Sequence, residues 1–175
     1  MAEYGRLIDG TVLEFERLLP GPIERVWEYF VNPDLRQKWF CAGKTDNHAG
    51  GTLTLSFDHT RISSAPPPEK YADDQGGDFD CEILVYEPPH RLDFSWPSEQ
   101  GNPPTEVSVQ LSERDGQVHL LLRHTRLESA EFINGASAGW HAHLDLLEDN
   151  LYGRTVPDFW PLHTALEDEY AKRLG

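Results

Sequence analysis

Two histidines interrupt apolar patterns at positions that suit acid–base chemistry or ligand binding. His124 ends an alternating apolar series that begins at Val118, and His143 borders a helical stripe that contains Trp140 and Leu144. An imidazole exchanges protons near neutral pH, whereas a buried neutral imidazole needs hydrogen-bond partners. We therefore expect His124 and His143 to reach one interior space, either satisfied by local partners or directed at a ligand.

Other chemistries have weaker support in the sequence. His141 and His143 point roughly 200° apart around a helix, and neither the i, i+4 spacing of a helical zinc site nor a paired cysteine motif occurs. Cys41 and Cys81 have no neighbouring base, and the chain has neither a glycine-flanked serine nor a phosphate-binding loop. We predict no catalytic residue, no metal ion and no cofactor. A pair of carboxylates stays an open alternative, because the chain is rich in acidic residues.

The composition limits the partners and the setting of the protein. The 175 residues include 15 basic and 30 acidic side chains, a net charge of −15, which disfavours nucleic acids and anionic membranes. No apolar run is long enough to span a bilayer, and the first residues lack a signal-peptide pattern. We expect a cytoplasmic protein with reduced cysteines. A single domain is expected over residues 1–175, with its core at about 11–152 and a terminal extension at 153–175.

Period-two alternation predicts an antiparallel sheet. Each candidate strand has one apolar face and one polar face, which is typical of a sheet with one buried side. The predicted strands cover residues 11–19, 52–57, 79–86, 92–96, 106–111 and 118–124. Between the second and third of them, residues 58–78 contain three consecutive prolines and many polar residues. We expect a mobile loop without a specific role there, with a functional lid as the alternative.

Helical periodicity occurs in four places. Residues 22–31 predict a helix after the first strand, and residues 34–39 predict a short helical turn. Residues 134–152 predict the longest helix, and residues 155–175 predict a terminal helix that Phe159 and Trp160 anchor to the body of the protein.

The long helix at residues 134–152 determines the expected architecture. One face carries Ala136, Trp140, Leu144, Leu147 and Leu151. Asn134 is the expected N-cap, and Gly153 is the expected stop. We expect His141 and Asp145 to point to solvent, and Gly139 to permit a close backbone approach.

Several segments resemble the START-like (SRPBCC, helix-grip) superfamily, and in particular the family homologous to the activator of the Hsp90 ATPase (AHSA1-like). The segments that carry the resemblance are residues 19–27, Asn32-Pro33 with Trp39-Phe40, Gly50-Gly51, residues 86–96 and Gly139-Trp140. The resemblance covers about residues 11–152. It implies an α+β fold in which a curved antiparallel β-sheet wraps around a long C-terminal α-helix, with a cavity between them. The segment at 58–78 and the extra terminal helix depart from the family pattern, and both could lie over the mouth of the cavity or at a dimer contact.

Inward-facing aromatic and apolar residues are the candidate lining of this cavity. They are Trp39, Phe57, Phe79, Phe94, Trp96, His124, Trp140, His143, Leu144 and Leu147. Our first hypothesis is a non-enzymatic protein that binds a small hydrophobic or aromatic ligand. The second, implied by the resemblance, is a chaperone-associated or stress-response interaction module. The third is a cavity-based cyclase or hydrolase that uses His124 or His143. A homodimer is also an open alternative.

Overall fold

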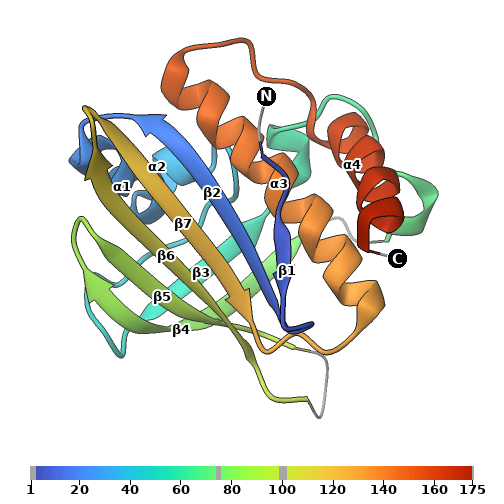
Figure 1. The fold of residues 1–175 in the computed structure, drawn as a ribbon, viewed down its shortest axis with the longest axis horizontal. Coiled ribbons are helices and arrows are strands. Elements are labelled where there is room, and N and C mark those ends of the chain that lie inside the picture. The colour runs from blue at the N-terminus through green and yellow to red at the C-terminus, as the bar shows by residue number, and fades with distance from the viewer. Residues whose placement is uncertain (1–2, 74–75, 99–101, 175) are drawn as a thin grey trace.

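Seven antiparallel strands form one curved sheet that holds a long helix against its inner face (Figure 1). The computed structural model describes residues 3–73, 76–98 and 102–174. The order of the strands in the sheet is β1-β2-β7-β6-β5-β4-β3. The strands are β1 (Arg6–Ile8), β2 (Val12–Pro20), β3 (Thr52–Phe57), β4 (Gly77–Glu87), β5 (Arg91–Trp96), β6 (Thr105–Arg114) and β7 (Gln117–Thr125).

The alternation of apolar residues explains six of the seven strands, which confirms the predicted antiparallel sheet. In β7, Val118, Leu120, Leu122 and His124 are all buried, and β7 pairs with both β2 and β6. The seventh strand, β1, is an edge strand of three residues that is too short to show a period. An Asp-Gly turn precedes β2, with φ of 51° and 72° at its two residues, and this dipeptide was the available signal for a hairpin.

The predicted face of β4 is only partly buried. Cys81 and Ile83 lie in the core, whereas Phe79 is 42% exposed. The pairing of β4 with β5 shifts register between Ile83 and Val85, which leaves Val85 half-buried. A bulge of this kind changes which side chains point inward, and simple alternation does not predict it.

Two short helices follow β2 and support the segment that leads into β3. The predicted apolar face of α1 (Ile23–Val31) is buried, and α2 (Pro33–Arg36) ends three residues before the expected end at Trp39. The buried guanidinium of Arg36 donates hydrogen bonds to the carbonyls of Cys41 (3.1 Å) and Gly43 (2.6 Å). These bonds fix the chain around Phe40, which lies at the centre of the site described below.

The longest helix, α3 (Ala130–Tyr152), begins four residues before the expected start. The prediction of Asn134 as the cap was wrong, because Ser129 is the N-cap and its side chain accepts a hydrogen bond from the amide of Phe132. The first turn is largely exposed, so no apolar stripe marked it in the sequence. Gly153 ends the helix in the left-handed region at φ 68°, as expected.

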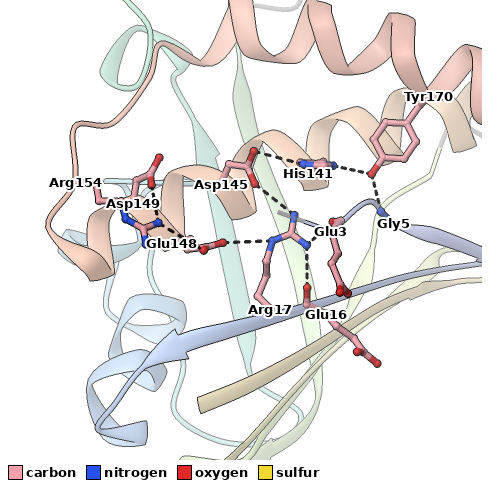
Figure 2. Close-up of polar contacts among 10 residues, drawn as sticks. All are labelled: Glu3, Gly5, Glu16, Arg17, His141, Asp145, Glu148, Asp149, Arg154 and Tyr170. Atoms are coloured by element: carbon pink, nitrogen blue, oxygen red, sulfur yellow. Dashed lines mark hydrogen bonds and ion pairs between the residues drawn. The ribbon is translucent and has the colours of Figure 1, made fainter. Parts of the chain in front are cut away.

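The terminal helix α4 (Phe159–Leu174) packs against α3, and Phe159 and Trp160 are buried as predicted. The prediction that His141 points to solvent was wrong, because its ring is 3% exposed. The α4 residue Tyr170 and the segment before β1 cover it, as Figure 2 shows. Thus α3 is covered on two sides, by the sheet and by α4.

The segment between β3 and β4 contains two 3-10 helices, η1 (His59–Arg61) and η2 (Glu69–Tyr71), and lies beside α4 (Figure 1). The carboxylate of Asp158 accepts hydrogen bonds from the amide and the hydroxyl of Ser64, and Glu167 accepts one from Tyr71. Residues 74–75 of the expected loop lie outside the described residues. Within the described part of the chain, we find no helix with the length and apolarity needed to cross a membrane.

Candidate functional site

A cavity of about 290 Å³ lies between the sheet, α3 and α4. Its first wall comes from the sheet and from the segment that Arg36 fixes. The residues of this wall are Phe40, Phe57, Phe79, Trp96 and His124. The exposed ring of Phe79 places part of this wall at the mouth of the cavity.

The second wall is the first half of α3, where small side chains leave room for the cavity. This wall consists of Phe132, Gly135, Ala136, Gly139, Trp140 and His143. The expectation that Gly139 permits a close backbone approach was wrong, because a Cβ atom added there would meet nothing within 4 Å. The missing side chain at Gly139 therefore opens space in the cavity.

The third wall comes from the two segments that depart from the family pattern, the β3–β4 segment and α4. It consists of His59, Tyr71, Gly76, Phe159, Trp160 and His163. These residues were not predicted as lining from the sequence, although Phe159 and Trp160 were expected to pack against the body and both segments were candidates to cover the cavity mouth. The remaining signal was that His59 and His163 each lie a few residues after an aromatic side chain in these two segments.

Aromatic rings pack around Phe40. The Phe40 ring stacks on Trp140 with centroids 5.3 Å apart, and the edge-on contact with His143 has a centroid distance of 4.9 Å. The ring centroid of Trp96 lies 6.4 Å from that of Phe40 and 5.7 Å from that of Trp140. Rings held in this way present flat, rigid, apolar surfaces to the cavity.

His124 has both ring nitrogens satisfied by protein partners. The indole N–H of Trp140 donates to Nδ1 at 3.0 Å, so the proton of the neutral ring is on Nε2, which donates to the hydroxyl of Thr105 at 2.7 Å. Burial lowers the pKa of His124 to about 4. This histidine is therefore neutral, fixed in position and occupied by its own neighbours.

His143 has a different arrangement. Its Nδ1 lies 2.8 Å from the carbonyl oxygen of Trp39, and because a carbonyl can only accept, Nδ1 carries the proton. Burial, together with a smaller effect of the nearby His59, lowers the pKa of His143 to about 3. The ring is consequently neutral, and its Nε2 is a hydrogen-bond acceptor.

The remaining polar groups lie where α4 meets the β3–β4 segment. Burial lowers the pKa of His163, and its Nδ1 lies 3.8 Å from a carboxylate oxygen of Glu167. Burial and the hydrogen bond to Glu167 raise the pKa of Tyr71. Glu167 also pairs with Lys70, so its charge is compensated outside the lining.

The structure brings six of the ten predicted cavity residues together at the cavity. They are Phe57, Phe79, Trp96, His124, Trp140 and His143. The other four lie in the packed core. Trp39 and Phe94 border a void of only about 10 Å³, no larger than one water molecule. Leu144 and Leu147 are fully buried further along α3, past the region where small residues open space.

The chemistry available in the cavity is limited. Within the described parts of the chain, no Asp, Glu, Lys or Arg belongs to the lining. Among the described residues, no group of three or more His, Cys, Asp or Glu side chains is arranged to hold a metal ion. Burial raises the pKa of Cys41 and of Cys81 to about 12, which disfavours a thiolate nucleophile at neutral pH. The arrangement suits the binding of an uncharged, largely apolar molecule.

Comparisons with known proteins agree with this architecture. The family model described as Activator of Hsp90 ATPase homolog 1-like protein matches residues 20–151. A Bordetella parapertussis protein solved by solution NMR is 38% identical, with 97% of this chain and 90% of that chain covered and a TM-score of 0.82.

Two further structures have lower identity. The crystal structure of CalU16 from Micromonospora echinospora is 25% identical, with 97% of this chain and 93% of that chain covered and a TM-score of 0.66. A solution structure of a dimeric protein from Colwellia psychrerythraea is 17% identical, covers 80% of this chain and 95% of that chain, and has a TM-score of 0.60. The last of these shows a likeness of fold alone. No functionally curated protein matched the sequence.

Proposed function

The chain belongs to the family of Activator of Hsp90 ATPase homolog 1-like proteins, with its helix-grip fold, and on this premise we propose that it binds a small aromatic or hydrophobic ligand without transforming it. The observation that carries the proposal is the cavity of about 290 Å³ with a largely aromatic lining. Ligand sites in proteins are concave and mainly apolar, with a few polar groups that orient the ligand. The cavity lies near the lower end of their usual size range of about 300–1,000 Å³.

Binding without chemistry is the function that the lining favours over catalysis. A cyclase or hydrolase needs a group that exchanges protons near neutral pH. No carboxylate occurs among the described lining residues, both nitrogens of His124 are occupied, and a His143 with a pKa of about 3 is a weak base. These features support a binding site whose histidines act as neutral hydrogen-bonding groups.

The test is titration with a neutral, solvatochromic aminonaphthalene dye, combined with mass analysis of ligands that co-purify. The wild-type protein is expected to bind the dye with a blue-shifted emission. Gly139→Leu places an isobutyl group in the open space beside α3 and is expected to weaken binding at least tenfold, while helix propensity favours folding. The matched control is Ala130→Leu, which adds a side chain at an exposed position of the same helix, outside the lining.

Two results would overturn the proposal. One is the absence of dye binding and of any co-purified ligand in the folded wild-type protein. The other is dye binding that Gly139→Leu leaves unchanged, because the dye would then occupy some other surface.

A second candidate function is a chaperone-associated interaction, which the description of the family supports. The dimeric Colwellia psychrerythraea structure also makes self-association a candidate. Pull-down with an Hsp90-type ATPase, an ATPase assay and light scattering of the isolated protein test these interactions. A monomer that forms no complex and leaves the ATPase rate unchanged would exclude them.

A further inference from the structure

The cavity has a polar interior end and an apolar mouth. His143 is 5% exposed, whereas Phe79 and Phe132 at the opening are each 42% exposed. The ring of Phe57 connects the two ends, because its centroid lies 6.4 Å from that of His143 and 6.0 Å from that of Phe79. A ligand that enters past Phe79 and Phe132 therefore meets His143 with its leading edge.

The tautomer of His143 determines which chemical group the ligand should carry at its leading edge. Its Nδ1–H is used by the carbonyl of Trp39, so Nε2 presents a lone pair. Within the described parts of the chain, no residue donates a hydrogen bond to Nε2. An acceptor enclosed beside an apolar ligand without a donor loses the hydrogen bond that water would supply.

The lining also excludes charge. Among the lining residues that the structure describes, no Lys or Arg is present to pair with an anionic ligand, and no Asp or Glu is present to pair with a cationic one. Transfer of an unpaired charge into such a site is costly, so a ligand that occupies it must be neutral.

The size of the cavity limits the ligand to a few rings. At about 290 Å³ it has roughly twice the volume of an engineered lysozyme cavity of about 150 Å³ that holds one benzene ring. The stacked rings of Phe40 and Trp140 present flat surfaces, which complement a planar molecule.

We propose that the cavity selects a neutral, planar ligand of about two fused rings that carries a hydroxyl group, or an equivalent donor, directed at Nε2 of His143. This inference rests on the proposed binding function and names the ligand class and the residue that sets it. His143 is the specificity-determining residue, whereas His124 contributes a fixed wall.

The test compares three bicyclic probes by equilibrium dialysis at pH 7. The first, 2-naphthol, has a donor. The second, 2-methoxynaphthalene, has the same rings without a donor, and the third, 2-naphthoate, is an anion. We expect 2-naphthol to bind about tenfold more tightly than 2-methoxynaphthalene, equivalent to about 1.4 kcal/mol. We expect 2-naphthoate to bind at least tenfold more weakly than 2-naphthol.

Two substitutions separate the two nitrogens of His143. His143→Asn places an amide N–H near the position of Nδ1, which keeps a donor for the Trp39 carbonyl and removes the acceptor at Nε2. With this variant, the ratio of the affinities for 2-naphthol and 2-methoxynaphthalene is expected to fall to about one. His143→Gln extends its amide oxygen toward the position of Nε2, and it is expected to retain part of the preference.

A spectroscopic measurement is independent of any variant. The ¹⁵N chemical shift of His143 Nε2 is expected to move when 2-naphthol binds and to stay nearly unchanged with 2-methoxynaphthalene. Equal affinities of these two probes, or a preference that His143→Asn leaves intact, would overturn the inference while the binding function stands. If none of the three probes binds, the proposed function fails and the inference fails with it.

Discussion

The two flanks of α3 use the same residue type in opposite ways. His143 faces the cavity, and His141, two residues earlier, faces α4 and the N-terminal segment. On the cavity flank, the lining is uncharged and one imidazole acceptor has no protein donor among the described residues. On the other flank, the polar groups satisfy one another.

A connected set of polar contacts occupies the flank of His141, as Figure 2 shows. The amide of Gly5 donates to the hydroxyl of Tyr170 at 2.7 Å, and this hydroxyl forms a hydrogen bond of 2.8 Å with Nδ1 of His141. The other ring nitrogen of His141 lies 3.5 Å from the carboxylate of Asp145, which pairs with Arg17 at 3.4 Å. Burial raises the pKa of Tyr170 to about 12, which keeps its hydroxyl protonated. These contacts hold α4 and the N-terminal segment against α3.

Arg17 connects this network to the sheet. Its guanidinium donates to the carbonyls of Glu3 and Glu16, and it lies 3.7 Å from the carboxylate of Glu148. A hollow of about 320 Å³ beside Arg17 is lined mostly by charged residues, whereas the described lining of the cavity of about 290 Å³ contains no Asp, Glu, Lys or Arg. Paired charges therefore stabilise one flank of the helix, whereas the other flank borders a cavity and carries an imidazole acceptor.

The largest expected effect is on the charged flank. Arg17→Met should lower the free energy of unfolding by about 3 kcal/mol, because the carboxylates of Asp145 and Glu148 lose their buried partner. Dye affinity of the folded protein should stay unchanged, since Arg17 is not part of the lining. Urea denaturation measures the first quantity and dye titration the second.

The matched control for Arg17→Met is Arg154→Met. Arg154 pairs with Glu148 and Asp149, but its side chain is 55% exposed, so the expected loss is at most about 1 kcal/mol. Equal losses for the two variants would contradict the structural role assigned to Arg17.

The second prediction concerns pH and the cavity flank. His143 has a lowered pKa in the native state, so below about pH 6.5 the unfolded chain binds a proton that the native protein does not. Its contribution to stability is therefore complete above that pH and is lost as the pH falls toward about 3. When the pH falls from about 6 to about 5, the unfolding free energy of the His143→Asn variant should decrease by about 1 kcal/mol less than that of the wild-type protein. Denaturation curves at the two pH values measure this difference.

The exposed His48 provides the control for the pH experiment. Because His48 is exposed, His48→Asn removes an imidazole without disturbing the packed core. A pH dependence that His143→Asn does not alter would argue against a buried, neutral His143.

The smallest effect is expected at Gly139. Gly139→Ala should raise the free energy of unfolding by up to about 1 kcal/mol, because alanine favours the helix and its Cβ meets no atom within 4 Å. The same methyl group occupies part of the cavity, so dye affinity should fall severalfold. A destabilised protein, or unchanged dye affinity, would contradict the open space that the structure places beside Gly139.

Most of the fold could be predicted from local patterns. Alternation indicated six strands, and the stripe from Ala136 to Leu151 indicated α3. The site was predicted in part. His124 and Trp140 come to the cavity as their patterns indicated, whereas Leu144 belongs to the packed core. Periodicity identifies the side of an element that is buried, but it does not show whether that side meets other side chains or empty space.

By itself, the sequence determined the antiparallel sheet, the long helix and the aromatic character of the interior, because these follow from the period and type of neighbouring residues. The tertiary structure alone decided which of the two neighbouring histidines on α3 faces the cavity. His141 became buried because α4 and the residues before β1 pack over it, and His143 kept an available acceptor because Trp39 uses only its other nitrogen. These partners lie far apart along the chain, so local sequence patterns do not reveal their contacts with α3.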